Sequence, residues 1–415
     1  MKKNVSVIRV AICLVSILIF ISCKKNTDEV LPTEPLSISL TTGQMQLIES
    51  QNVFAFDIFK KVIENADESE NIIISPLSIS LALSMTLNGA NGETRNAMLN
   101  ALRSDGIAPE NINISYKDLS DALLKIDKRV LISIANSVWT ENNFVVKKPF
   151  PDILTQYYNA EAESFDISDP GAPDKINSWI ERNTNGLIDN MIDELNDNTV
   201  MLLINAIYFK GKWKTQFDKS QTIKSEFHKS DGKFSEVLMM KKKSDFRIFQ
   251  GEGFKIAEFP YGQGNFVMDI ILPEEVNGLS VLAQKLDEST FADWLIKMTK
   301  REVQVSLPRF KYGYKEKMKS ILTDMGMGIA FTENADFSGI SDAQLLINDV
   351  IHQAFIETDE EGTEAAAATI VDIGLTSAPL DPAVFTADRP FLYIIRETTT
   401  NSIQFMGKIA DPILN

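Results

Sequence analysis

Apolar and polar residues follow helical spacing in some parts of the chain and extended spacing in others. A helix is predicted for the segment QLIESQNVFAFDIFKKVIE, whose apolar positions share one helical face: Val53, Phe56, Ile58 and Phe59. A second helix is predicted to begin at Pro76, because proline suits the first helical position and Ser75 is a good N-cap. The small residues Ser78, Ser80 and Ser84 would let this second helix lie close to a sheet.

Strands are predicted where the apolar runs are continuous. The longest is TVMLLINAIYFKGKW, which is typical of a strand buried on both faces. Further strands are predicted for FVMDIILP, VQVSLPRF and FLYIIRE. The breaks between these elements are short and no internal repeat is present, so the pattern predicts one mixed α/β body.

One segment fits neither pattern. Between Asp359 and Pro382 the chain reads DEEGTEAAAATIVDIGLTSAPLDP. It has no wide apolar stripe for a core helix, its alanines are poor strand formers, and it is long for a plain loop. We infer that this segment is able to change its structural state.

The first residues predict export. Residues 1–22 have the pattern of a signal peptide, with three cations, no acid and an apolar run too short to span a bilayer of roughly 30 Å. Cys23 follows FIS in a context similar to a bacterial lipobox, in which the cysteine is lipidated; an ordinary cleaved signal is the alternative. Residues 23–43 are polar with two prolines and predict a tether. We therefore expect a protein anchored by lipid in a bacterial cell envelope, with the cell surface as one location.

Charge and cysteine content narrow the possible partners. The chain of 415 residues has a net charge of −16, which argues against nucleic acid and anionic membrane surfaces as partners. The lipid would then be the only contact with a membrane. The basic run MMKKKSDF (239–246) is interpreted as a solvated surface turn, with a heparin-like site as the alternative. Cys13 leaves with the signal peptide and Cys23 carries the lipid, so the mature fold is expected to contain no disulfide.

Catalytic motifs are absent from the sequence. The chain has only two histidines, His228 and His352, and it lacks the common serine-hydrolase, zinc-protease and P-loop signatures. Nothing singles out a pair of carboxylates, so no catalytic residue, metal or cofactor is expected. His352 and Asn205 both lie on apolar predicted strands and need buried hydrogen-bond partners, which they could provide for each other.

Several stretches, in order, together resemble the serpin family of serine-protease inhibitors. They are NIIISPLSISLALSMTLNGANGETRNAM, INSWIERNTNGLI, LLINAIYFKGKWKTQF, VSLPRFKYGYKEKMKSILTDMGM, IHQAFIETDEEGTEAAAAT and FTADRPFLYIIRE. They cover nearly all of the chain after residue 44. The resemblance implies one α+β domain over residues 44–415, with three β-sheets, about nine helices and an exposed reactive loop at about 360–385. It also implies a monomeric inhibitor rather than an enzyme.

The resemblance also assigns roles to residues. It implies that a protease cleaves the loop and that the hinge then enters the main sheet as a new strand, which traps the protease; the hinge residues are Gly362, Thr363, Glu364, Ala365, Ala366, Ala367, Ala368 and Thr369. On a strand, the set that begins with Thr363 carries no charge and would face the core, whereas Glu364 falls on the other face. Gating or structural roles are expected for Glu360 paired with Arg309, for Trp213, and for Ser75, Ser78, Asn205 and His352.

The loop length usual in the family puts the cleaved bond at Thr376–Ser377, with Leu375 as the alternative bait residue. No lysine or arginine occurs between Thr363 and Asp388, so trypsin-like proteases find no cation for their acidic pocket. A threonine suits elastase-type proteases, and papain-like cysteine proteases stay open as targets. A non-inhibitory binding lipoprotein with the serpin fold is the alternative function.

Lipidation at Cys23 gives a first testable prediction. Replacing Cys23 with alanine removes the only thiol that could carry the lipid, so the protein should leave the membrane fraction. A soluble form that starts near Leu40 should behave like the full chain in every protease assay. Unchanged membrane association of the Cys23→Ala variant would contradict lipid anchoring.

Overall fold

The computed structural model describes residues 32–184, 186, 188, 190–362 and 382–413. The compact unit begins at Pro32, ahead of the boundary expected at residue 44. The Asn265 side chain binds the backbone of Leu36 through two hydrogen bonds. It accepts from the Leu36 N–H (2.9 Å) and donates to the Leu36 carbonyl (2.7 Å). The later part of the predicted tether therefore packs on the domain.

Nine α-helices occur in the described ranges: α1 (Thr42–Asn65), α2 (Pro76–Leu87), α3 (Gly92–Ala101), α4 (Pro109–Leu123), α5 (Pro149–Ile153), α6 (Ala172–Asn183), α7 (Leu279–Lys285), α8 (Glu288–Lys297) and α9 (Lys319–Leu322). Helix α2 begins as predicted, with the Ser75 side chain accepting from the Ser78 N–H. All twelve of its residues are buried, which its small serines permit. On α1 the prediction for Val53 is wrong, because this side chain is 38% exposed.

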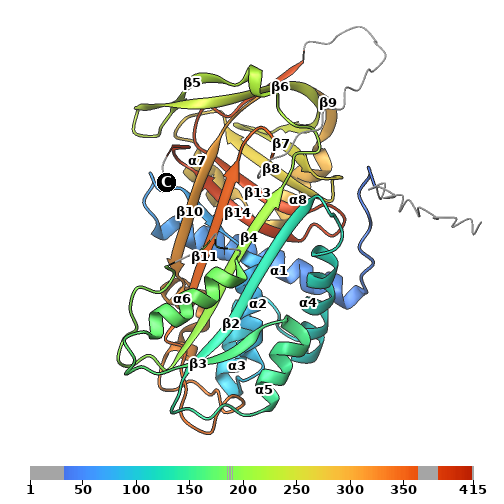
Figure 1. Cartoon of the computed structure of the whole chain (residues 1–415). Coiled ribbons are helices and arrows are strands. Elements are labelled where there is room, and N and C mark those ends of the chain that lie inside the picture. Colours follow the sequence, from blue (N-terminus) through green and yellow to red (C-terminus); the bar gives the residue numbers. More distant parts are fainter. Residues whose placement is uncertain (1–31, 185, 187, 189, 363–381, 414–415) are drawn as a thin grey trace, which may run out of the picture. The chain divides into compact units, whose positions relative to one another are not determined.

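Five strands form one sheet in the order β10–β11–β4–β2–β3 (Figure 1). Their bounds are β2 (Val130–Glu141), β3 (Glu161–Phe165), β4 (Met201–Gly211), β10 (Phe310–Lys317) and β11 (Asp349–Thr358). The apolar run at 200–213 forms β4, at the centre of this sheet and buried as predicted. Strand β4 runs parallel to its neighbour β11, although almost 140 residues of the chain separate the two strands.

The other described strands form a nine-stranded sheet in the order β1–β14–β13–β8–β7–β6–β9–β12, with β5 paired to β6. Their bounds are β1 (Ile72–Ile74), β5 (Ile223–His228), β6 (Phe234–Gln250), β7 (Phe254–Tyr261), β8 (Phe266–Pro273), β9 (Thr299–Pro308), β12 (Ala383–Thr386), β13 (Phe391–Glu397) and β14 (Ile403–Ile409). The long β6 pairs with β5 over residues 234–239, with β9 over 239–248 and with β7 over 247–250. It thereby joins two of the three sheets implied by the resemblance. The interpretation of residues 239–246 as a turn is wrong, because they lie inside β6.

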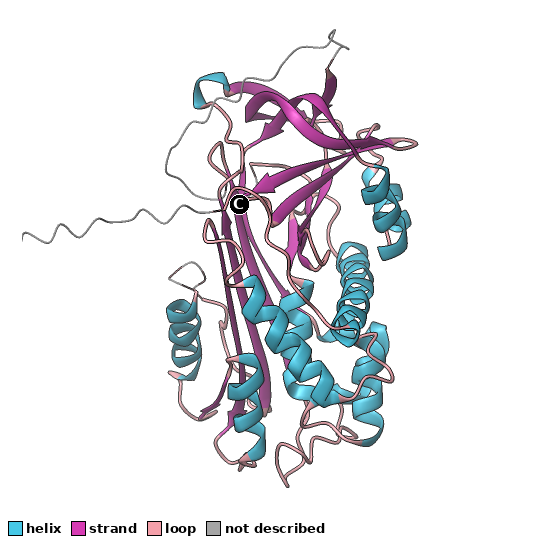
Figure 2. Cartoon of the chain, turned by 90° about the vertical axis from the view of Figure 1, so that its right-hand side faces the viewer, coloured by secondary structure: helices cyan, strands magenta, loops and turns pink. Residues whose placement is uncertain are grey.

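Helices cover both faces of the five-stranded sheet (Figure 2). On one face α6 encloses a small core, in which the Trp139 and Trp179 rings meet edge to face at 6.3 Å. On the other face α1, α2 and α4 belong to the large core that continues into the nine-stranded sheet. Odd-numbered β4 residues such as Leu203 and Ile207 face this large core, and even-numbered ones such as Ile204 face α6.

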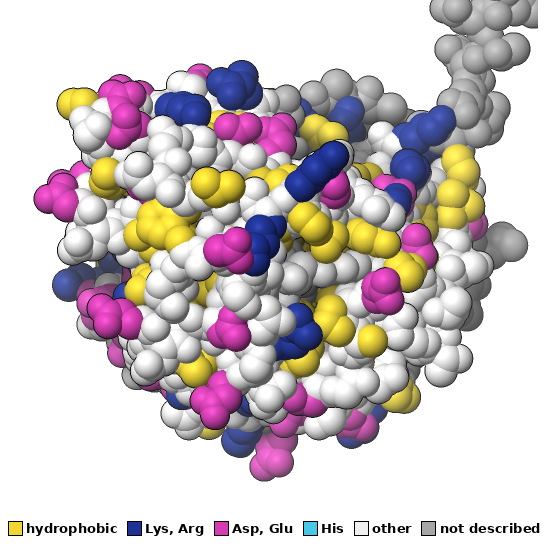
Figure 3. Space-filling model, turned by 90° about the horizontal axis from the view of Figure 1, so that it is seen from below, with side chains coloured by type: hydrophobic (Ala, Val, Ile, Leu, Met, Phe, Trp, Pro, Cys, Tyr) yellow, Lys and Arg dark blue, Asp and Glu magenta, His cyan; other side chains and the backbone are white. Residues whose placement is uncertain are grey.

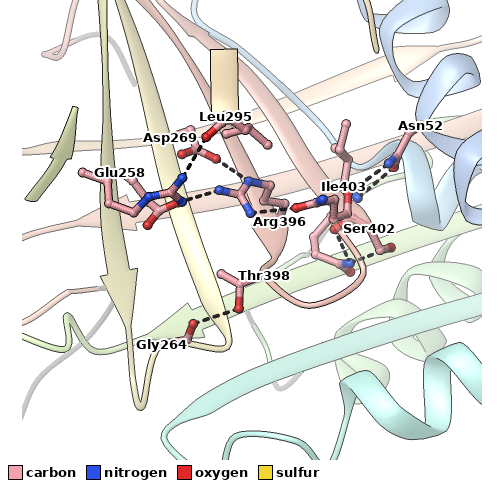
Figure 4. Close-up of polar contacts among 12 residues, drawn as sticks. Asn52, Glu258, Gly264, Asp269, Leu295, Arg396, Thr398, Ser402 and Ile403 are labelled. Carbon is pink, nitrogen blue, oxygen red and sulfur yellow. Dashed lines mark hydrogen bonds and ion pairs between the residues drawn. The ribbon is translucent and has the colours of Figure 1, made fainter. Parts of the chain in front are cut away.

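A buried cluster of charges crosses the nine-stranded sheet (Figure 4). Arg396 on β13 donates to Asp269 on β8 (2.7 Å) and to Glu258 on β7 (2.6 Å), and Arg247 on β6 also contacts Glu258. Burial raises the pKa of Asp269 to about 6 in spite of the adjacent Arg396. Removing one member would leave an uncompensated charge in the interior, at a cost of about 3–5 kcal/mol.

The surface mixes charges of both signs. In the view of Figure 3, acidic, basic and apolar side chains are interspersed, without a large area of one sign. Among the described residues, no helix combines the length and the apolar character that crossing a membrane requires.

Candidate functional site

Strands β4 and β11 are paired over only part of their length. The parallel register runs from Asp349 opposite Leu202 to Phe355 opposite Tyr208. Both strands continue for three residues beyond this point, to Thr358 and Gly211. The chain after β11 turns back to the end of β4, where it meets the residue that follows this strand.

That segment makes a tight turn from Asp359 to Gly362. The backbones of these two residues exchange hydrogen bonds of 2.9 and 3.2 Å, and Gly362 also forms a bridge to Lys212, just after β4. Gly362 has φ of 121°, and a Cβ there would lie 2.3 Å from the Gly211 carbonyl oxygen. Only glycine combines this backbone conformation with so close an approach.

The carboxylate of Glu360 fastens the turn to the sheet. Arg309 donates to its Oε1 from Nε (2.9 Å) and Nη2 (2.6 Å), and Thr222 donates to the same oxygen. Burial alone would raise the pKa of Glu360, but the hydrogen bonds from Arg309 and Thr222 outweigh burial and hold this pKa below its ordinary value. The side chain of Glu360 is 1% exposed and that of Arg309 is 38% exposed, so the pair lies at the boundary between interior and solvent.

Trp213 supports the turn from the end of β4. Its indole N–H donates to the Asp359 carbonyl (2.8 Å), and its backbone N–H donates to the Glu361 carbonyl (2.9 Å). The indole ring stacks on Tyr261 of β7, with ring centroids 4.3 Å apart. The side chain of Glu361 forms an ion pair with Lys219. The turn is thus held by side chains from three separate parts of the chain.

A second polar cluster lies inside the domain, on the same two strands. His352 of β11, Asn205 of β4 and Asn136 of β2 are neighbours in a row across the sheet. His352 Nε2 accepts from the backbone N–H of Ser75 (3.1 Å), so Nδ1 carries the proton and donates to Asn205 Oδ1 (2.5 Å). The Asn205 amide donates to Ser78 Oγ and to Asn136 Oδ1.

This cluster connects the sheet to helix α2. Ser75 and Ser78 belong to the start of α2, and the Ser75 hydroxyl donates to the Gln404 carbonyl of β14 (2.7 Å). Burial lowers the pKa of His352 to about 3, so the ring is neutral at physiological pH. The prediction that His352 and Asn205 satisfy each other is confirmed.

The comparisons with known proteins agree with this geometry. The family model described as "Serpin (serine protease inhibitor)" matches residues 49–412. A serine protease inhibitor of Cyanea capillata is 36% identical over 371 residues, which are 86% of this chain and 96% of the relative. The chain belongs to the serpin family. Among solved structures, the thermophilic serpin tengpin in its native state has a TM-score of 0.82 at 32% identity, covering 92% of this chain and 98% of tengpin. Human thyroxine-binding globulin, complexed with thyroine, has a TM-score of 0.82 at 27% identity, covering 89% of this chain and 99% of that structure.

The serpin fold brings the predicted residues into two groups. Glu360, Arg309 and Trp213 meet at the turn, and His352, Asn205, Ser75 and Ser78 meet in the internal cluster. The hinge residues 363–369, the bond at 376–377, Leu375 and Cys23 lie outside the described residues.

Sequence reasoning missed four members of these groups: Lys219, Thr222, Tyr261 and Asn136. Lys219 and Thr222 are about 140 residues from their partners, and no local pattern marks them. Asn136 carried a usable signal, since it is a polar residue within the apolar run VLISIANSVW.

The neutral state of His352 predicts a pH dependence of stability. The pKa is about 3 in the folded protein and about 6.5 when unfolded, so His352 contributes stability above pH 6.5 that is lost as pH falls toward 3. In this range the free energy of unfolding falls by up to about 1.4 kcal/mol per pH unit. We expect the melting temperature of the wild type to fall more steeply between pH 6.5 and 4 than that of His352→Gln.

The other histidine is the matched control. His228 is exposed at the end of β5, so His228→Gln should keep the wild-type profile. Parallel profiles for wild type and His352→Gln would contradict the role given to the buried ring.

Proposed function

We propose that this serpin inhibits proteases as a suicide substrate. A protease would cleave the loop at Thr376–Ser377, and the freed hinge would insert between β4 and β11 before the acyl-enzyme is hydrolysed. The observation that carries this proposal is the bridge between Gly362 and Lys212, because it already aligns the chain antiparallel to β4.

The register of this bridge supports insertion in one particular alignment. Continuing it down β4 would set Thr363 opposite Gly211, Ala365 opposite Phe209 and so on in antiparallel order. Glu364 would then lie opposite Lys210, and directly opposite charges of unlike sign stabilise a strand pair.

The faces of the sheet agree with this alignment. Odd-numbered β4 residues face the large core, so the uncharged hinge set that begins with Thr363 would face it too. Val371 and Ile373 would be buried by insertion, each contributing roughly 1.5–3 kcal/mol. An inserted strand would also replace one parallel pairing by two antiparallel ones, and antiparallel pairing is slightly more stable per residue.

The target class follows from the bait residue. Threonine at 376 suits the small or medium apolar pocket of elastase-type serine proteases, and Leu375 would suit a somewhat larger one. Papain-like cysteine proteases are a further target class to include in the assay. We also propose that the protein is exported and held at the cell envelope by a lipid on Cys23.

Insertion gives the deciding test of the proposed function. In Thr363→Arg the first inserting side chain would carry an unpaired cation into the core, at a cost of several kcal/mol. Wild type incubated with an elastase-type protease should form a covalent complex that survives denaturing electrophoresis. Thr363→Arg should instead be cleaved as a substrate at the same bond, with complex formation reduced at least tenfold.

Glu364→Arg is the matched control, since this side chain would point away from the large core and should leave most complex formation intact. Equal complex formation by Thr363→Arg and wild type would refute insertion as the trapping step. A panel that includes papain-like proteases tests the target class in the same assay.

The alternative function is a non-inhibitory binding lipoprotein with the serpin fold, and melting temperature separates the two. If the hinge inserts, the cleaved form gains a paired strand and buried apolar surface that the intact form lacks. The cleaved inhibitor should therefore melt well above the intact protein, by tens of degrees if most of the strand inserts. Equal melting temperatures would favour the binding lipoprotein.

A further inference from the structure

A small cavity on the nine-stranded sheet has an unusual concentration of cations. Its volume is about 200 Å³, and β6, β7, β9, β12 and the end of α8 contribute its lining: Ile248, Phe249, Gln250, Lys255, Lys297, Thr299, Arg301, Ala383 and Val384. Three of these nine residues are basic and none is acidic. In a chain with net charge −16, such a lining requires an explanation.

Two of the three cations have no acidic partner among the described residues. Arg301 is exposed on β9, and its side chain makes neither an ion pair nor a hydrogen bond with the described residues. Lys255 donates only to the backbone carbonyl of Val384 (3.1 Å). Lys297 pairs with Asp293 one turn earlier on α8, and its Nζ lies 5.9 Å from the centre of the Phe249 ring.

Two acids contact lining residues, since Asp293 pairs with Lys297 and the Glu274 carboxylate accepts from the Gln250 side chain (2.6 Å). The other nearby acids are engaged elsewhere. Glu258 is held by Arg247 and Arg396 in the buried cluster. Glu302 pairs with Lys243 (2.9 Å), and Asp245 lies 3.9 Å from Lys300. Among the described residues, none of these acids pairs with Arg301 or Lys255, so the charges of these two side chains are not neutralised by an ion pair.

The remaining lining is apolar. Ile248 is buried, Phe249 is half-buried, and Val384 is 51% exposed. A cavity of 200 Å³ is smaller than the range of about 300–1,000 Å³ typical for drug-sized ligands. It suits a small molecule that combines a strong anion with a compact apolar group, since guanidinium groups bind sulfate and phosphate oxygens in pairs.

We propose that this cavity binds an organic phosphate or sulfate monoester, with the oxyanion on Arg301 and Lys255 and the ester group against Phe249 and Val384. The proposal does not rest on the protease-inhibitor function. It has a structural consequence, because Ala383 and Val384 begin β12, a four-residue strand whose one pairing among the described strands is with β9. An anion shared by Arg301 on β9 and Lys255 on β7 would hold β12 in place.

Phenyl phosphate is the probe that tests this site, with isothermal titration calorimetry of the full domain at low salt. We expect saturable one-to-one binding by wild type and at least tenfold weaker binding by Arg301→Gln. The double variant Lys255→Gln/Arg301→Gln should show no detectable binding. Inorganic phosphate should bind at least tenfold more weakly than phenyl phosphate, because it lacks the apolar group.

Lys300→Gln is the matched control. Lys300 neighbours Arg301 on β9, but its side chain is 70% exposed and is not part of the cavity lining, so its loss should change affinity less than twofold. An equal loss in Lys300→Gln and Arg301→Gln would mean diffuse attraction to surface charge and would overturn the site. Absence of saturable binding by wild type would overturn it as well, and equal affinity for inorganic phosphate would overturn the ester class.

Hydrogen–deuterium exchange provides a readout that locates the ligand. Phenyl phosphate should slow exchange of the amides of residues 383–386 in wild type and should leave them unchanged in Arg301→Gln. Protection that appears elsewhere in the domain, but not in β12, would contradict binding in this cavity.

Discussion

The parallel pairing of β4 with β11 is the interaction on which the rest of this serpin depends. The backbone N–H and C=O groups that hold β4 to β11 are the groups with which an inserted antiparallel strand would have to pair. The pairing stops at Phe355 and Tyr208, and the chain after β11 turns back at Gly362 to meet the end of β4. Under the proposed function, an inserted antiparallel strand would use these same backbone groups in a more stable pairing.

Two side-chain clusters accompany this pairing, one at the turn after β11 and one inside the domain, and they differ in physical character. The cluster around Glu360 is charged and partly open to solvent through Arg309, so each of its contacts is individually modest. The cluster around His352 is wholly buried and neutral, and its groups satisfy one another with hydrogen bonds. Separating β4 from β11 would break the contact between His352 and Asn205 and expose buried polar groups, which is costly until new partners replace the lost ones. The outer cluster is therefore suited to fixing the turn, and the inner one to resisting spontaneous opening.

Buried charged groups in the domain are satisfied either by an ion pair or by hydrogen bonds, as Glu397 is by Thr399 and Thr400. Arg396 is matched by Asp269 and Glu258 deep in the nine-stranded sheet. The cavity beside β12 is a local exception, because Arg301 and Lys255 face solvent with no acid among its lining residues. Desolvation explains the contrast: an unpaired cation is tolerable where water reaches it and is costly where water does not.

The sequence by itself determined the local elements and the chemical character of each face. The Ser75–Pro76 cap, the buried β4 run and the need of His352 and Asn205 for partners were readable because capping, burial and hydrogen-bond satisfaction act over a few residues. The resemblance to serpins added the pairing of Glu360 with Arg309. Tertiary structure alone decided that Lys219 and Thr222 join Glu361 and Glu360, that the basic run at 239–246 lies within a strand, and that four strands and a helix enclose a cationic cavity. These outcomes depend on strand register and on contacts between residues far apart in the chain, and a local pattern of apolar and polar positions specifies neither.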